Sequence, residues 1–113
     1  MNADIDKLIL EAQRAKLSER RTEPRHPFVR PVQMYLGKEA AVLAFSKDMS
    51  KQGIGVITDM ELEAGTIAVL TIHSTSHTPV TLKCELRWSD KFGKGWFLTG
   101  WKFLSSAAVP RGV

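Results

Sequence analysis

The sequence predicts a mainly β domain, an antiparallel barrel or sandwich, preceded by one α-helix. Three observations support this fold class. The first stretch carries apolar residues at helical spacing, whereas the remainder contains short segments in which apolar and polar residues alternate. Glycine-containing turns separate these segments, and about six short strands with tight connections are typical of antiparallel barrels and sandwiches.

The helix is predicted over residues 3–19 and is amphipathic. Its apolar stripe consists of Ile5, Leu8, Ile9, Ala12 and Ala15. Asp4 is a suitable N-cap, and Pro24 and Pro27 prevent the helix from continuing past them. Two roles stay open for the stripe. It covers one end of the β domain, which we favour, or it forms a surface for a partner or a second copy of the chain.

The clearest strand is predicted over residues 80–88, where apolar and polar side chains alternate without exception. Its apolar positions are Val80, Leu82, Cys84, Leu86 and Trp88. Weaker strands are expected at residues 29–36, 40–47, 53–58, 66–73 and 95–103. The alternation assigns Trp88 to the inner face, so core packing is favoured for it. Trp96 and Trp101 are assigned to the barrel core or its closure.

Length and composition fit a single globular domain. The chain has 113 residues, which suits one modest core. One cysteine, Cys84, allows neither an intramolecular disulfide nor a cysteine-based metal cluster. The N-terminal stretch is acidic and no run of about 20 apolar residues occurs, so we expect no signal peptide, no membrane insertion and a cytoplasmic location.

The positive charge of the chain is concentrated in one segment. The formal net charge is +4, and residues 14–30 hold six basic side chains against two acidic ones. The basic residues are Arg14, Lys16, Arg20, Arg21, Arg25 and Arg30. A guanidinium cluster on an otherwise neutral chain favours one anionic ligand site over a surface for a nucleic-acid polymer. Taken alone, the arginines are explained equally well as partners of the helix dipole.

Two short motifs carry the strongest functional signal. Arg21 and Arg25 are four residues apart, and Asp48, Ser50 and Gly53 follow after about one strand pair. Taken alone, the second motif is more often turn chemistry, in which Asp and Ser bond their own backbone. Together, in this order and on a β pattern, the motifs resemble the two signatures of the PilZ family, Arg-x-x-x-Arg and Asp/Asn-x-Ser-x-x-Gly.

The resemblance implies a six-stranded antiparallel β-barrel that binds the second messenger cyclic di-guanylate (c-di-GMP). It covers residues 20–104, the PilZ-like barrel, which follows the N-terminal helix over residues 1–19. The small and polar residues 105–113 are expected to form a flexible tail. The resemblance also implies a receptor or adaptor without a cofactor, which relays the ligand signal to a downstream protein or acts as a homodimer. In this family a basic residue at the position of Arg20 is associated with binding a stacked pair of ligands.

The chemistry of the motif residues suits this ligand. A guanidinium donates two hydrogen bonds to a phosphate or to guanine O6 and N7. Asp48 supplies an acceptor for the N1–H and N2 amino groups of guanine, and the Ser50 hydroxyl adds a contact to a phosphate or purine edge. Gly53 would let the chain turn sharply and bring backbone N–H groups close to the ligand. The less favoured role for Trp88 is stacking on a guanine.

Three other functions are weighed against this one. A degenerate PilZ-like barrel would bind a protein partner and no nucleotide, although such members usually lack the motif residues kept here. A barrel for single-stranded nucleic acid is ranked last, because the aromatic residues lie far in sequence from the arginines. Catalysis is not expected, since no nucleophile elbow, Walker loop or carboxylate pair is recognised. His73 and His77 have no acidic companions, so no metal site is expected.

Overall fold

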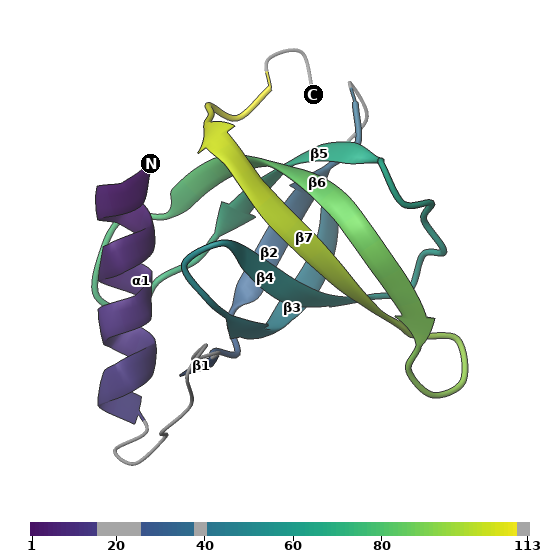
Figure 1. Ribbon diagram of the computed structural model, residues 1–113, viewed down its shortest axis with the longest axis horizontal. Coiled ribbons are helices and arrows are strands. Elements are labelled where there is room, and N and C mark those ends of the chain that lie inside the picture. The colour runs from purple at the N-terminus through teal and green to yellow at the C-terminus, as the bar shows by residue number, and fades with distance from the viewer. Residues whose placement is uncertain (16–25, 38–40, 111–113) are drawn as a thin grey trace.

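The computed structural model describes residues 1–15, 26–37 and 41–110. Its elements are α1 (Asn2–Ala15), β1 (His26–Pro27), β2 (Pro31–Tyr35), β3 (Val42–Met49), β4 (Gly53–Thr58), β5 (Ile67–Ile72), β6 (Val80–Lys91) and β7 (Phe97–Ser106). Figure 1 shows the strands curving around a common centre, with α1 on one side of them. The predicted continuation of the helix to residue 19 lies outside the described residues.

The strands form one closed antiparallel barrel. Their order is β1-β3-β2-β5-β6-β7-β4, and a further β3–β4 pairing joins the two ends of the sheet. Strands β2 to β7 therefore make the six-stranded barrel, and the two-residue strand β1 pairs with the end of β3 beyond β2. The predicted fold class, a mainly β antiparallel barrel with an N-terminal helix, is confirmed.

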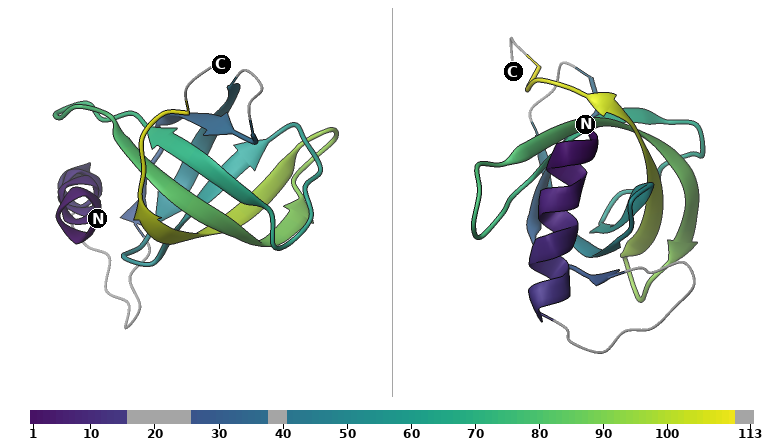
Figure 2. Two further views of the ribbon diagram at one scale, coloured as in Figure 1. Left: turned by 90° about the horizontal axis from the view of Figure 1, so that it is seen from above. Right: turned by 60° about the vertical axis from the view of Figure 1, so that its left-hand side comes forward.

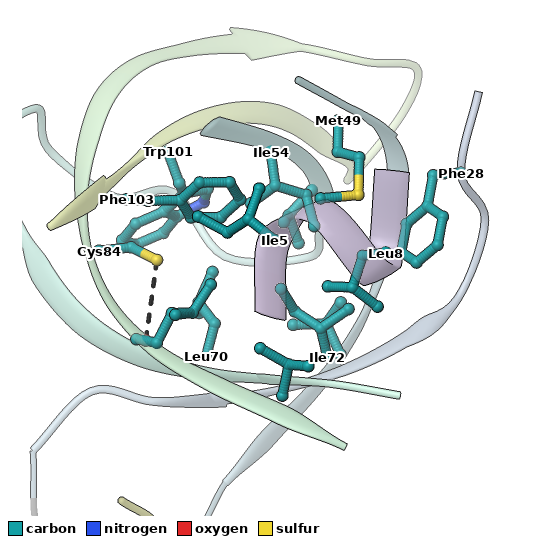
Figure 3. Close-up of a cluster of buried hydrophobic side chains, with 14 of the residues drawn as sticks. Ile5, Leu8, Phe28, Met49, Ile54, Leu70, Ile72, Cys84, Trp101 and Phe103 are labelled. Atoms are coloured by element: carbon teal, nitrogen blue, oxygen red, sulfur yellow. Dashed lines mark hydrogen bonds between the residues drawn. The ribbon is translucent and has the colours of Figure 1, made fainter. Parts of the chain in front are cut away.

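Apolar side chains from all six barrel strands fill the interior. The fully buried ones include Val32, Met34, Met49, Ile54, Val56, Leu70, Ile72, Leu82 and Leu86. They occupy alternate positions of most strands, as expected when one face of a strand is buried. Figure 3 shows part of this cluster, with Trp101 and Phe103 of β7 beside Ile54 of β4.

Helix α1 lies across one end of the barrel (Figure 2). Ile5, Leu8 and Ile9 are at most 5% exposed and belong to the same buried cluster as the strand residues. Burying each such side chain contributes roughly 1.5–3 kcal/mol. The stripe thus covers the barrel, which is the role favoured from the sequence. No helix in the described part of the chain is long and apolar enough to cross a membrane.

The prediction that Trp88 packs in the core is wrong. The alternation of β6 holds as far as Leu86, which is fully buried. The register then shifts, because Leu86 pairs with Trp101 while Trp88, two residues on, pairs with the adjacent Gly100. Such a bulge inserts one extra residue and reverses the face of those that follow. Trp88 consequently points outward and is 44% exposed.

Two further details of the hairpin formed by β6 and β7 differ from the prediction. Trp96 lies in the connection between the strands and is 49% exposed, so it is not part of the core. Trp101 is 2% exposed and does belong there. Strand β7 continues through Ser105 and Ser106, which pair with Lys83 and Leu82, so the sheet extends beyond residue 104.

Candidate functional site

Asp48 holds its carboxylate on the outer face of the barrel. It follows a register shift between Ser46 and Asp48 in β3 and pairs with Gly55 of β4. The carboxylate leans over this glycine: a Cβ added at Gly55 would lie 2.6 Å from Asp48 Oδ1. The side chain of Asp48 is 23% exposed, and its Oδ2 lies 3.6 Å from Lys47 Nζ. The carboxylate oxygens of Asp48 therefore reach the barrel surface beside Gly55, which has no side chain to block them.

The position of Asp48 is one end of a row that crosses four strands. Gly55 pairs with Gly100 of β7, and Gly100 pairs with Trp88 of β6. The indole of Trp88 lies directly on Gly100, so that a Cβ at this glycine would overlap its ring. We call Asp48, Gly55, Gly100 and Trp88 the outer row. It has a carboxylate at one end and a half-exposed indole at the other, and these two groups lie over the glycines between them.

Ser50 and Gly53 form the turn that joins β3 to β4. The Ser50 N–H donates to the Gly53 carbonyl at 2.9 Å, and the Gln52 N–H donates to the Ser50 hydroxyl at 3.3 Å. The Gln52 carbonyl in turn accepts from the Phe103 N–H of β7 at 2.9 Å. The turn is thus fixed to the strand beyond it. Ser50 is half-buried and lies beside the end of the outer row that carries Asp48.

Gly53 has a packing role that the sequence did not indicate. Its φ is outside the positive region, which contains only Gly37, Gly65, Gly93 and Gly95 among the described glycines. A Cβ at Gly53 would overlap the carbonyl oxygen of Trp101, because β4 and β7 approach closely at this point. A close backbone approach therefore requires a glycine at this end of the turn, and the left-handed conformation does not.

Arg20, Arg21 and Arg25 lie outside the described residues. The structure does describe the chain directly after them, which enters β1 beside the outer row. His26 pairs with Met49 and Pro27 pairs with Asp48. The Phe28 N–H then donates to the Lys47 carbonyl at 2.9 Å. Of the predicted site residues, the structure therefore brings Asp48, Ser50 and Gly53 together.

A buried hydroxyl fixes the segment after β1. Ser46 is 1% exposed and accepts from the Arg30 N–H at 2.9 Å, while its own hydroxyl donates to the Phe28 carbonyl. The Ser46 N–H also donates to the Arg30 carbonyl at 2.9 Å. Residues 28–30 are consequently held against β3 at the bulge that positions Asp48.

Arg30 is engaged by a carboxylate and is therefore not available to an anionic ligand. Its Nε donates to Glu11 Oε2 of α1 at 2.7 Å, and a second guanidinium nitrogen lies 2.6 Å from the same oxygen. Its guanidinium carbon also lies 4.7 Å from the ring centroid of Phe28. The basic cluster counted from the sequence is thus reduced by one member, because a charge count cannot reveal which cation is already paired.

Glu11 joins three parts of the chain at one point. Besides Arg30, it accepts from the Ser74 hydroxyl at 2.6 Å and the Thr75 N–H at 3.4 Å, both in the connection between β5 and β6. Burial alone would raise the pKa of Glu11, but the hydrogen bonds from Ser74, Arg30 and Thr75 and the charge of Arg30 outweigh it and lower the pKa. Glu11 therefore stays ionised and holds α1 on the barrel.

The sequence matches the PilZ domain family over residues 19–109. The chain belongs to the PilZ family. This confirms the resemblance drawn from the two motifs, and PilZ domains are generally c-di-GMP-binding adaptors rather than enzymes. No curated protein matches the sequence.

A solved structure supports the PilZ fold. The "Inhibitor of motility (MotI/DgrA)" of Bacillus subtilis is similar, with a TM-score of 0.64 and 21% sequence identity. The similarity covers 80% of this chain and 46% of that protein, so this chain spans less than half its length. At this identity the likeness concerns the fold alone.

The described part of the chain also contains side chains of the types that bind metals, and it includes the single cysteine. It contains no group of three or more His, Cys, Asp or Glu side chains that could hold a metal ion. Burial raises the pKa of the Cys84 thiol to about 12, so that it stays protonated. Its sulfur lies 3.7 Å from the Leu82 carbonyl in the core (Figure 3).

Sequence reasoning missed Gly55 and Gly100 as site residues. Both lie inside predicted strands, where a glycine often marks a place that another group approaches closely. The sequence therefore showed a glycine within each strand, but it did not show that the two glycines lie side by side. The two residues are far apart in the chain and become neighbours only through the β4–β7 pairing.

Proposed function

We propose that this PilZ domain is a receptor for c-di-GMP that binds its ligand over the outer row. The observation that carries the proposal is the pairing of a carboxylate and an indole across two glycines. Neighbouring strands lie about 4.8 Å apart, so three steps separate the ends of the row by roughly 14 Å. Glycine at residues 55 and 100 leaves room for the Asp48 carboxylate and the Trp88 indole to lie over the strands, where any other residue would place its own side chain.

Each end of the row suits a different feature of guanine. The Asp48 carboxylate accepts hydrogen bonds from the N1–H and N2 amino donors, which adenine does not present in the same way. The half-exposed face of Trp88 stacks on a purine, an interaction of roughly 1–3 kcal/mol per base. The proposal thus assigns specificity for the base to Asp48 and stacking to Trp88.

The arginines would supply the phosphate contacts. Arg25 precedes His26 by one peptide bond, and consecutive Cα atoms are about 3.8 Å apart. Because His26 pairs with Met49, this proximity along the chain favours Arg25 as a ligand-binding residue near Asp48 and Ser50. Two or three charge-assisted hydrogen bonds of about 1.5–3 kcal/mol each are compatible with micromolar affinity after ordering costs.

Titration calorimetry tests the receptor function. We expect saturable binding of c-di-GMP and none of cyclic di-adenylate, and a loss of at least about tenfold in affinity for Arg25→Ala. Lys83→Ala removes an exposed charge near the far end of β6 and should bind like the wild type. Two nucleotides per chain would support a stacked pair at Arg20. Absence of heat from folded protein would refute the proposal.

The Glu11 junction suggests a route for the signal. The arginine motif lies between α1 and β1 in sequence, and Glu11 ties α1 to Arg30 just after β1. A ligand that draws this segment toward the outer row would therefore act on both attachment points of the helix. We propose that the helix then presents an altered surface to a partner protein or a second copy. Slower or faster amide exchange in α1 on ligand addition would reveal this change.

A protein-interaction module without nucleotide binding remains the second candidate. Leu43 and Phe45 on the outer face of β3 are 63% and 46% exposed, which is typical of a contact surface. The calorimetric experiment separates the two functions, because this candidate requires no heat with c-di-GMP. A cytoplasmic location, where the nucleotide would be met, is part of the receptor proposal.

A further inference from the structure

The connection between β6 and β7 exposes two aromatic side chains that the nucleotide site does not use. Phe92 and Trp96 are 44% and 49% exposed. They close a three-residue loop, since the Phe92 N–H donates to the Trp96 carbonyl at 2.8 Å. The outer row meets this hairpin at Trp88, and the pair formed by Asp90 and Leu98 lies between Trp88 and the aromatic positions.

The tip of this loop is shaped by glycine and carries one cation. Gly93 and Gly95 have φ values of 78° and 79°, a conformation that favours glycine and fixes a tight turn. Lys94 between them is the only side chain at the tip, and Lys91 precedes the aromatic pair. Both lysines are exposed, and residues 91–97 contain no acid. The nearest acidic residue in the sequence is Asp90, one residue before Lys91.

The loop projects from the molecule. In Figure 1 it extends beyond the ends of β6 and β7, and in the left view of Figure 2 it lies at the opposite end of the molecule from α1. The projecting tip is short, with Lys94 between two glycines, so it presents a small area to a second folded protein. It does fit a deformable, planar surface that can bury the exposed Phe92 and Trp96 side chains.

We propose that this hairpin docks on an anionic lipid surface. Phe92 and Trp96 would enter the region of the headgroups, where aromatic side chains with an apolar body and a polar edge are favoured. Lys91 and Lys94 would lie among the anionic headgroups, and each adds about fivefold to partitioning near such a surface. Two aromatics and two lysines make a reversible, peripheral contact and not an inserted anchor.

Sedimentation with vesicles tests the proposal without nucleotide, so its outcome does not depend on the receptor function. We expect the protein to bind phosphatidylcholine vesicles that contain about one part in three phosphatidylglycerol, and to bind pure phosphatidylcholine far less. Replacing both lysines, Lys91→Gln with Lys94→Gln, should weaken binding about 30-fold. The double variant Lys7→Gln with Lys83→Gln changes the net charge equally at two exposed sites elsewhere and should keep it.

The aromatic contribution is tested separately. Phe92→Ala with Trp96→Ala should also lose binding, whereas Leu10→Ala on the exposed face of α1 should not. All the substituted side chains are exposed, so the variants are expected to fold, and circular dichroism checks this. Equal binding to neutral and anionic vesicles, or unchanged binding of the Lys91/Lys94 variant, would overturn the proposal. Absence of wild-type binding would also overturn it.

Discussion

Glu11→Gln is expected to weaken the attachment of α1 to the barrel. The substitution keeps the size of the side chain and one acceptor oxygen, but it removes the charge that faces Arg30 at 2.6 Å. Breaking a buried ion pair by removing one partner costs about 3–5 kcal/mol. The Arg30 side chain is 20% exposed and regains some hydration, so we expect a loss of about 2–3 kcal/mol. This corresponds to a fall in Tm of roughly 10 °C.

The pH dependence of this loss follows from the direction of the Glu11 pKa shift. The folded state lowers the pKa below the ordinary value of 4.5, so Glu11 binds its proton less readily in the folded chain than in the unfolded one. Its stabilising contribution is fully present above the ordinary value and disappears as the pH falls through the lowered pKa. The difference between wild type and variant should therefore shrink in acid.

Urea denaturation followed by tryptophan fluorescence measures both effects, because Trp101 is buried in the core. Glu61→Gln, at an exposed glutamate in the connection between β4 and β5, is the matched control. If Glu11→Gln unfolded at the same urea concentration as Glu61→Gln at neutral pH, the junction would contribute nothing and the reasoning would fail. A difference that persisted unchanged well below pH 4 would contradict the electrostatic origin.

Three further predictions concern the site and the core. Gly55→Ala forces the Asp48 carboxylate aside and should lower c-di-GMP affinity at least about tenfold with little change in Tm, as measured by calorimetry and thermal denaturation. Trp88→Ala should cost roughly 1–3 kcal/mol of binding, whereas Trp88→Phe should retain part of it; equal affinity for both would argue against stacking. Cys84, buried and with its pKa raised to about 12, should resist iodoacetamide in the native protein and react in urea, and rapid native labelling would show that the core opens.

The sequence predicted those features of the fold that depend on local periodicity. Alternation in residues 80–86 places Leu82, Cys84 and Leu86 inside, as observed. It failed at Trp88 because a bulge depends on how two strands pair, and pairing is not encoded in the pattern of one strand. The helix stripe was likewise local, whereas its ion pair between Glu11 and Arg30 required the folded arrangement.

The candidate site was predictable only in part for the same reason. Asp48 and Ser50 could be recognised because the motif is contiguous in the chain. Gly55 and Gly100 could not be assigned to a shared surface, because only barrel closure brings β4 beside β7. Gly53 was recognised as a motif residue, but the steric requirement for glycine could not be. A side chain there would overlap the carbonyl of Trp101, which is distant in the sequence.

The route of the outer row across the barrel has a consequence for biosynthesis. Asp48 and Gly55 belong to the first half of the chain, whereas Trp88 and Gly100 belong to the last two strands. A nascent chain emerges from its N-terminus, so the row cannot exist on the ribosome until β7 has been made and has closed the sheet against β4. Proteolytic fragments that lack the C-terminal strand would lack the row as well. A ligand held across it would accordingly be retained only by complete, closed barrels.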